Sequence, residues 1–512
     1  MKKYSAVLAL AALFSFTTLN AKDWPQGSGG NGNFQSDKPA PTEWSVVLDQ
    51  NVAWKLTLPE TGQNTPVISK GKVFFSTYQP FEKDTKIGKD ITAWCCDAKT
   101  GEVIWKRDIP AQYDLRISGC FSDSTSPPAV SDGEHVVFVN ASGAVECFSH
   151  EGEPLWRQEF LSVGRTMPFL HDGNVVFTRQ NYPPDPDGHF PHKYKDSPKE
   201  MWTQLQALDL KTGDVAWTTE CGCNLGMTMM PQKLSDGRNV VVVGRGGGHG
   251  PPEKPLGISM IDLADGKTVW TLPLDDFAAT MTFGIRNDQV HVFHGAEHLS
   301  VDCMTGQIAK RISFHDKVSV RHWNGGERAT TTENLKAGKS RNITQGSNLL
   351  VGPWNYFRHY KNPWLGRVNV DTGTVEYIEL PLQLSRAPGQ DDELKWLDPD
   401  GPKLETQTIV PNDMKNSRGL VVFDDKRCAG TGWGHIASPT PSVAGDKLYI
   451  PVMTGTVYVI NWDAKTLDEN AVVAINDLGL AGQSFTRGSI SFANGKAYAH
   501  TIKELICIDS ES

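Results

Sequence analysis

The chain alternates between short apolar strands and polar turns, and one such unit recurs along it. Segments such as "TPVISKGKVFFST", "SPPAVSDGEHVVFV", "PTPSVAGDKLYIP" and "GSISFANGKAYAH" each indicate a short strand, a tight polar turn and a second strand rich in Val, Phe and Tyr. After a loop of variable length come a third strand, an Asp-x-x-Thr-Gly turn and a fourth strand that ends in Trp. We name these strands A, B, C and D.

The turn between strands C and D sets the register of the repeat. Its copies are "CDAKTGEVIW", "CFSHEGEPLW", "LDLKTGDVAW", "IDLADGKTVW", "VDCMTGQIAK" and "VNVDTGTVEY", with two degenerate copies in "INWDAKTLDEN" and the C-terminal "CIDSES". The column that begins with Cys96 is apolar in all eight copies, as expected for a buried strand. Eight repeats of four antiparallel strands predict an all-β fold, an eight-bladed β-propeller.

The ends of the chain are expected to close the ring. The last repeat stops after its third strand, whereas "NVAWKL" near the start places Trp54 in the Trp column. We therefore predict that residues 52–56 supply the missing strand D, in a sheet with residues 496–500 and 505–508. Such a closure removes the free edges of the sheet.

Two adjacent cysteines, Cys95 and Cys96, are either a redox pair or two small strand residues. Cys96 lies in the apolar column, and Cys95 lies on the alternate face of the same strand, so their side chains should point in opposite directions. We predict two reduced, structural thiols.

Composition and the N-terminus restrict the class of protein. A net charge of -9 without a basic block argues against nucleic acid and against an anionic membrane surface as partners. Two lysines, an apolar run over residues 6–16 and Ala21 predict a signal peptide over residues 1–21. No later stretch approaches the roughly 20 apolar residues of a membrane span. We expect a periplasmic or secreted monomer, a single propeller over residues 22–512 with insertions at about 311–341 and 378–436.

The opening "DWPQ", the segment "NVAWKL" and the "D-x-x-TG-x-x-x-W" turns resemble the pyrroloquinoline-quinone-like (PQQ-like) β-propeller repeat family. The resemblance covers nearly the whole mature chain and is to an exported bacterial member without the lipoprotein cysteine, since no cysteine precedes Cys95. The family includes quinoprotein alcohol dehydrogenases, a non-catalytic lipoprotein of outer-membrane assembly and exported proteins of unknown role. The resemblance therefore implies the fold and leaves the function open.

For the dehydrogenases, the resemblance implies calcium held by carboxylates and an amide, an indole under the quinone and a vicinal disulfide above it. In this chain the only adjacent cysteines lie at the exit of strand C, at the end opposite to the expected cofactor. We predict no cofactor and no metal; PQQ with calcium is the disfavoured alternative.

Loop lengths differ between the two faces of the predicted disk. The A–B and C–D turns are short throughout, whereas the long insertions fall in the B–C loops and the D–A connections. We call the face that carries them the elaborated face. One-sided elaboration predicts that this face binds a ligand or a partner.

The segments that lead into strand A supply the first candidate ligand-binding residues. Because strand A lines the central channel, we expect these side chains to converge at its mouth and to bind an anionic or polyhydroxylated ligand. The alternative is that each arginine makes a surface or inter-blade ion pair. The residues are Arg165, Arg341, Arg487 and His435, with Asp123 as the main carboxylate.

Two further segments add candidates. "GRGGGHGPPE" contributes His249, although it lacks the Gly-Lys-Ser/Thr and the helix of a phosphate-binding loop. Residues 352–366, assigned to a B–C loop, contribute Trp354, Tyr356 and His359 as groups that stack on a sugar or another flat ligand. The alternative is a loop that packs a small core of its own.

Two functional classes remain. The first is a binding module for a glycan-like ligand or an extracytoplasmic protein. The second is an enzyme, either a PQQ-dependent dehydrogenase or a polysaccharide-active enzyme that uses the channel mouth, and for it no catalytic residue is identified. Quinone chemistry with calcium needs several carboxylates, whereas the segments leading into strand A carry mainly Arg, His, Thr and Met. Binding is therefore favoured.

Overall fold

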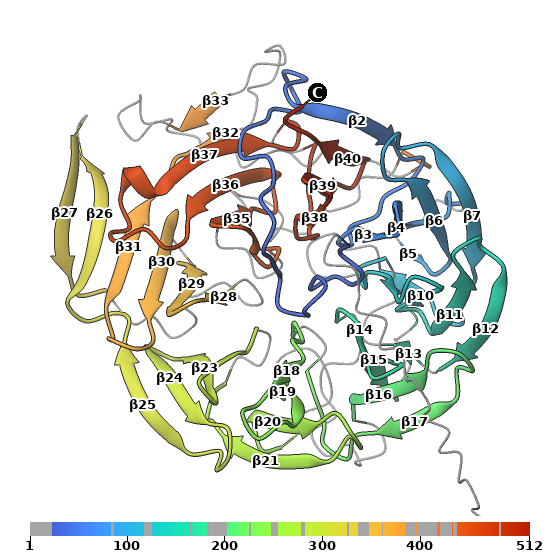
Figure 1. Cartoon of the computed structure of the whole chain (residues 1–512), viewed down its shortest axis with the longest axis horizontal. Coiled ribbons are helices and arrows are strands. Elements are labelled where there is room, and N and C mark those ends of the chain that lie inside the picture. Colours follow the sequence, from blue (N-terminus) through green and yellow to red (C-terminus); the bar gives the residue numbers. More distant parts are fainter. Residues whose placement is uncertain are drawn as a thin grey trace, which may run out of the picture.

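The protein is an all-β, eight-bladed propeller of four-stranded antiparallel blades (Figure 1), which confirms the predicted fold. The computed structural model describes residues 23–82, 87–116, 125–160, 162–163, 166–181, 186, 202–224, 227–246, 254–277, 282–324, 327–335, 348–360, 362–384, 395–397, 417–419, 433, 438–480 and 483–511. The only helix among them is the 3-10 turn Glu469–Ala471. No helix in these ranges is long and apolar enough to cross a membrane.

Each blade consists of strands A to D, counted from the channel outward. Blade 1 is formed by β3 (Val67–Ser69), β4 (Lys72–Tyr78), β6 (Ile91–Asp97) and β7 (Val103–Ile109). Blade 2 is formed by β9 (Val130–Ser131), β10 (His135–Asn140), β11 (Ala144–Ser149) and β12 (Pro154–Glu159). Blade 3 is formed by β14 (Phe169–His171), β15 (Asn174–Gln180), β16 (Gln204–Asp209) and β17 (Val215–Thr218). Blade 4 is formed by β18 (Gln232–Lys233), β19 (Asn239–Arg245), β20 (Gly257–Asp262) and β21 (Thr268–Pro273).

The second half of the ring repeats this order. Blade 5 is formed by β22 (Gly284–Arg286), β23 (Gln289–His294), β24 (Glu297–Asp302) and β25 (Ile308–Ser313). Blade 6 is formed by β28 (Leu349–Val351), β29 (Trp354–Arg358), β30 (Trp364–Asn369) and β31 (Val375–Glu379). Blade 7 is formed by β34 (Ser442–Ala444), β35 (Lys447–Pro451), β36 (Thr456–Asn461) and β37 (Val472–Asp477). Blade 8 is formed by β38 (Ser491–Ala493), β39 (Lys496–His500), β40 (Glu504–Ile508) and, from the N-terminal end, β2 (Val52–Thr57).

The ring closes as the sequence predicted. β2 pairs antiparallel with β40, with Val52 opposite Ile508 and Leu56 opposite Leu505. β40 in turn pairs with β39, and β39 with β38. Backbone hydrogen bonds between the two ends of the chain therefore hold the last blade together.

The recurring Trp and Gly of the repeat are packed against each other between neighbouring blades. A Cβ added to Gly266 would lie 2.5 Å from the ring of Trp217 on the preceding blade, and one added to Gly213 would lie 2.7 Å from Trp156. Both glycines also have positive φ, at 74° and 76°. The indole of Trp156 donates to the carbonyl of Leu210, 2.8 Å away. The Trp of one blade thus packs against the Thr-Gly turn of the next blade.

The Asp of the repeat holds the same turn from inside. Asp209 Oδ1 accepts hydrogen bonds from the backbone N–H groups of Lys211 and Thr212, both at 2.9 Å. Asp97 and Asp302 bind their turns in the same way. These bonds lower the pKa of all three carboxyl groups.

An N-terminal strap, residues 23–36, crosses the centre of the disk on the side of the A–B turns (Figure 1). Trp24 exchanges two backbone hydrogen bonds with Ile68 of blade 1, both 2.9 Å long. The backbone N–H of Ser131 donates to the carbonyl of Pro25, and that of Leu170 donates to Gln26 Oε1. At its other end the strap forms β1 (Gln35–Ser36), which pairs parallel with β34 of blade 7. The repeat pattern of the sequence does not predict this element.

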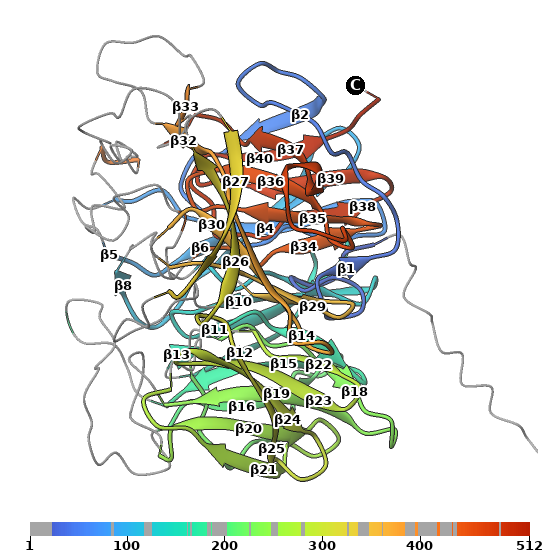
Figure 2. The same ribbon diagram turned by 90° about the vertical axis from the view of Figure 1, so that its left-hand side faces the viewer.

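The elaborated face carries additional strands on the side opposite to β1 (Figure 2). β5 (Ile87–Gly88) pairs with β8 (Leu115–Arg116), and β32 (Leu382–Leu384) pairs with β33 (Lys395–Leu397). β13 (Ser162–Val163) adds to blade 3. By contrast, β26 (Val318–Asn324) and β27 (Glu327–Glu333), from the 311–341 insertion, extend the sheet of blade 6 outward at the rim of the disk (Figure 1), because β26 pairs parallel with the outer strand of that blade. This part of the insertion therefore does not lie on the elaborated face, where the sequence placed it.

Candidate functional site

Arg487 is the one candidate from the segments leading into strand A that lies within the described residues. It is half-buried before β38, and its Nη1 donates to Ser126 Oγ, 3.3 Å away. Ser126 precedes β9, so Arg487 of blade 8 reaches the segment that leads into blade 2. The other candidates of this group lie outside the described residues and stay predictions: Arg165, Arg341, His435 and Asp123.

The segments leading into blades 8, 1 and 2 are joined by a buried polar network beside Arg487. Asn64 Nδ2 donates to Ser76 Oγ and to the carbonyl of Thr125, both at 2.8 Å. Thr486 Oγ1 donates to the carbonyl of His500, and His500 Nδ1 lies 3.1 Å from the carbonyl oxygen of Asn64. Burial lowers the pKa of His500 to about 4, so its ring is neutral at pH 7.

The long 378–436 connection also reaches this side of blade 1. Its residue Ser417 donates its backbone N–H to Glu60 Oε2 at 2.8 Å, and its hydroxyl accepts from the backbone N–H of Phe81 at 2.8 Å. Burial raises the pKa of Glu60, although the hydrogen bonds from Ser417 and Thr61 act in the opposite direction. A segment that starts after blade 6 is therefore anchored on blade 1.

The assignment of residues 352–366 to a B–C loop was wrong. Trp354 and Tyr356 lie on strand β29, directly after a two-residue turn. Tyr356 is fully buried; its hydroxyl donates to the carbonyl of Trp462 at 2.7 Å and accepts from Arg367 Nη1 at 3.1 Å. The Arg367 guanidinium lies 3.8 Å from the centre of the Trp354 ring and pairs with Glu376. Tyr356 thus packs between blades 6 and 7, with no exposed face on which a ligand could stack.

His359 follows strand β29 and is buried. Its Nδ1 accepts a hydrogen bond from the backbone N–H of Asn362 at 3.1 Å, and its ring lies 5.2 Å from that of Trp364. His249, from the glycine-rich segment, lies outside the described residues.

Sequence reasoning missed Arg358, the last residue of β29. It is fully buried, and its Nη2 donates to the carbonyls of Pro439, at 3.2 Å, and Pro451. Within the described part of the chain, its Nε and Nη1 have no hydrogen-bond partner. Burial lowers its pKa to about 9. The sequence feature that marks Arg358 is a charged residue at the end of the buried strand in "NYFRH".

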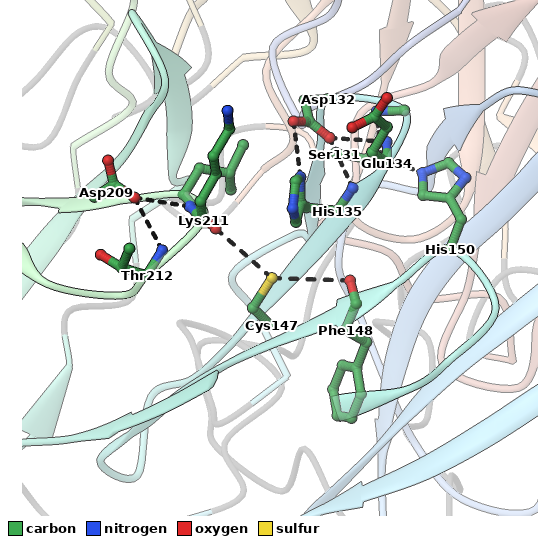
Figure 3. A network of polar contacts seen from close by, with 12 residues as sticks. Ser131, Asp132, Glu134, His135, Cys147, Phe148, His150, Asp209, Lys211 and Thr212 are labelled. Atoms are coloured by element: carbon green, nitrogen blue, oxygen red, sulfur yellow. Dashed lines mark hydrogen bonds and ion pairs between the residues drawn. The ribbon is translucent and has the colours of Figure 1, made fainter. Parts of the chain in front are cut away.

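The adjacent cysteines are strand residues, as predicted. Cys95 packs in a core cluster with Phe74 and Trp105, whereas Cys96 packs in another with Val73. Both thiols are free, and burial raises the pKa of each to about 12. Cys147 is equally buried and its thiol contacts the carbonyls of Phe148 and Leu210 (Figure 3). These buried thiols pack in the hydrophobic cores between the blades.

The described residues do not fit the quinone and calcium site that the family resemblance implies. They contain no cluster of three or more His, Cys, Asp or Glu side chains placed to hold a metal ion. Cys95 and Cys96 face different cores, so they do not form the vicinal disulfide of that site.

A polar hollow lies on the other side of the disk, between the strap and the inner strands of blades 4, 5 and 6. It has a volume of about 470 Å³. We call it the strap groove. A smaller hollow of about 350 Å³ lies where the residues after the strap pass the A–B turn of blade 8.

Comparisons with known proteins agree with the repeat. Residues 88–284 match the family model described as outer membrane protein assembly factor BamB. No curated protein matches the chain in sequence. Quinohemoprotein alcohol dehydrogenase ADHIIG from Pseudomonas putida HK5 is similar in structure, with 12% identity, a TM-score of 0.54 and coverage of 96% of this chain and 81% of that one.

Two further solved structures are similar. Quinohemoprotein alcohol dehydrogenase from Comamonas testosteroni has 12% identity and a TM-score of 0.53, over 96% of this chain and 81% of its own. A europium-containing methanol dehydrogenase has 11% identity and a TM-score of 0.50, over 94% and 90%. At this identity the likeness establishes the fold alone. The family-model match over residues 88–284 and the repeat register observed in the blades are consistent with the resemblance to the PQQ-like repeat family.

Proposed function

We propose that this protein is an extracytoplasmic binding propeller, which holds an anionic or polyhydroxylated, glycan-like ligand or a protein partner on its elaborated face. The extracytoplasmic location rests on the predicted signal peptide over residues 1–21. Arg487 binds the ligand, together with Arg165, Arg341 and His435.

The observation that carries this proposal is the difference between the two faces. On the side of the A–B turns, the strap fills the centre and buries Trp24 and Phe34 against the inner strands. On the other side, β5 with β8, β32 with β33, and residues 417–419 extend beyond the blades. Between the strands of the repeat, the loops around the segments that lead into strand A are lengthened, whereas the A–B and C–D turns stay short.

The chemistry of Arg487 supports an oxyanion ligand. A guanidinium group offers a planar fork of donors that matches carboxylate, sulfate or phosphate. Arg487 is half-buried, and a charge-assisted hydrogen bond in such a place contributes about 1.5 to 3 kcal/mol. Ser126 and the Asn64 network hold the neighbouring backbone in place.

The test is a binding screen with anionic oligosaccharides, with PQQ plus calcium as a separate arm. We expect Arg487→Ala combined with Arg165→Ala to weaken binding at least tenfold while the melting temperature stays nearly unchanged. The matched control is Arg238→Ala, which removes a half-buried guanidinium paired with Asp236 in the A–B turn of blade 4. Normal binding by the double variant would refute the proposed site. If the protein oxidised an alcohol in the presence of PQQ and calcium, its function would be that of a dehydrogenase and not that of a binding protein.

A further inference from the structure

The strap groove has a polar lining that carries positive charge. Its seven polar residues are Asn31, Asn33, Gln35, Gln232, Lys233, Arg286 and Asn287. The lining, all of which lies in the described residues, includes no carboxylate and no aromatic ring. Asp371, which pairs with Arg286 Nη2 at 3.0 Å, stands outside it. The volume of about 470 Å³ lies within the range of about 300–1,000 Å³ of small-molecule sites.

Some of these groups are held by the protein and others are left for a ligand. Gln35 Nε2 donates to the carbonyl of Leu350 at 3.2 Å, and Asn33 Oδ1 accepts from the backbone N–H of Gln35 at 3.2 Å. By contrast, the side chains of Asn31, Lys233 and Asn287 have no hydrogen-bond or ion-pair partner within the described part of the chain, and all three are exposed.

Arg286 gives the groove a second, more rigid cation. Its Nη2 is fixed by Asp371, while its Nε is buried without a hydrogen-bond partner among the described residues. A buried donor without a partner destabilises the fold, and a ligand acceptor in the groove would relieve that cost.

The inner strands of the groove have no free edge for an extended peptide. The side chain of Gln232 accepts from the backbone N–H of Ile285 at 2.6 Å and donates to the carbonyl of Phe283 at 3.0 Å. Gln35 Nε2 likewise donates to the carbonyl of Leu350 in blade 6. Peptide binding by strand addition, which relies on such free backbone groups, is therefore disfavoured.

We infer that the strap groove is a second binding site, on the face opposite to Arg487, for a short acidic oligosaccharide. Amide side chains both donate and accept hydrogen bonds, as sugar hydroxyls do, and Asn31 and Asn287 are free to provide them. Lys233 and Arg286 match the carboxylates or sulfates of an acidic sugar. Met230, Ile285 and Leu350 supply an apolar floor for its C–H groups.

Calorimetric titration of the full mature protein with tetragalacturonate, and with maltotetraose as the neutral comparator, tests this inference. We expect the acidic chain to bind at least tenfold more tightly than the neutral one, with an affinity that falls as salt is raised. Lys233→Ala combined with Asn287→Ala should weaken tetragalacturonate at least tenfold. Asn31→Asp, which keeps the size of the side chain and adds a negative charge, should weaken it as well. The control is Lys211→Ala, an exposed lysine in the C–D turn of blade 3.

The outcome separates this site from the proposed elaborated-face site. Because tetragalacturonate also belongs to the ligand class proposed for Arg487, the titration is repeated with Arg487→Ala, and the tenfold weakening by the Lys233 and Asn287 changes should persist in that variant. If Arg487→Ala abolishes that binding while the Lys233 and Asn287 changes do not affect it, the groove is not the site, and the elaborated face is. Absence of tetragalacturonate binding, or equal binding of the neutral chain, would overturn the inference and leave the function proposed for the elaborated face to its own test.

Discussion

Four of the buried histidines have a pKa that burial lowers far enough to keep the ring neutral. It lowers the pKa of His150, His291 and His500 to about 4, and it lowers that of His298 well below its ordinary value. His291 and His298 are stacked, with ring centres 5.3 Å apart, and neither has an acidic hydrogen-bond partner among the described residues. Charging any of these rings would place a cation in a core.

These pKa shifts predict a loss of stability at mildly acidic pH. Above about pH 6.5, the histidines are neutral in both the folded and the unfolded chain. As pH falls from about 6.5 to 4, the unfolded chain binds protons that the folded protein does not, so the free energy of unfolding falls, on the order of 2 kcal/mol for each histidine. Urea unfolding at pH 7.5, 6 and 5 measures this decline.

A control separates the histidines from the carboxylates. The turn carboxylates Asp97, Asp209 and Asp302 have lowered pKa values, so their contribution is lost only below about pH 4. Replacing His291 by Gln should make the decline between pH 7.5 and 5 shallower. Stability that stays constant over this interval would contradict the assignment.

The roles of single residues could be predicted where the repeat defines a column. Cys96 shares its column with seven other apolar residues, and its burial follows from that pattern. Trp354 and Tyr356 were misassigned because their two-residue turn, Gly352-Pro353, lacks the polar residues of the other A–B turns. The partner that explains Trp354, Arg367, lies on the next strand, and sequence spacing does not show that contact.

At the scale of elements, side-chain amides take the place of a neighbouring strand along the inner edges of the blades. Gln26, which is buried, accepts from the backbone N–H of Leu170 in blade 3 and donates to the carbonyl of Gly29. Gln232 and Gln35 do the same for blades 5 and 6. An unpaired inner edge would leave backbone groups without partners.

Gln26→Leu should therefore lower the free energy of unfolding by about 1 to 3 kcal/mol, because the N–H of Leu170 loses its partner, while the carbonyl of Gly29 keeps the N–H of Gly32. Hydrogen exchange at Leu170 should become faster. Lys38→Leu, at an exposed position just beyond the strap, should change neither quantity. Unaltered exchange at Leu170 in the Gln26 variant would refute this role of the strap.

The blades could be predicted from sequence and the strap could not, for a physical reason. Each blade is predicted by a local pattern of alternating apolar residues and a Gly turn, whereas "WPQGSGGNGNFQS" has no strand periodicity. Its contacts are with residues far along the chain, such as Ile68, Leu170 and Val443. The strap groove depends on those contacts, so it too was invisible in the sequence.

On the scale of the whole molecule, the ring has two different faces. The strap binds the inner strands of five blades on one face, and the insertions extend beyond the blades on the other. The loop lengths in the sequence predicted this asymmetry, and they indicated a binding site on the elaborated face alone. The face with short turns also has a polar hollow, because a segment outside the repeat was added to it.

The closure of the ring leads to a prediction about cooperativity. β40 lies between β39 and β2, so it is the only strand that joins the N-terminal end of the chain to blade 8 in the described structure. Its residues Leu505 to Ile508 are fully buried. Deleting all residues after Lys503 should therefore release β2, open the ring between blades 8 and 1, and lower the melting temperature of the whole protein in one transition.

A shorter truncation is the control for this deletion. Removing only residues 510–512, which lie beyond β40, leaves the pairing of Val52 with Ile508 in place and should leave the melting temperature unchanged. Differential scanning calorimetry of both truncations separates loss of closure from loss of chain. If the protein without residues 504–512 melts like the full chain, the N-terminal strand does not close the propeller. A separate early transition, with the remainder intact, would mean that blade 8 unfolds alone and that the ring is not a single cooperative unit.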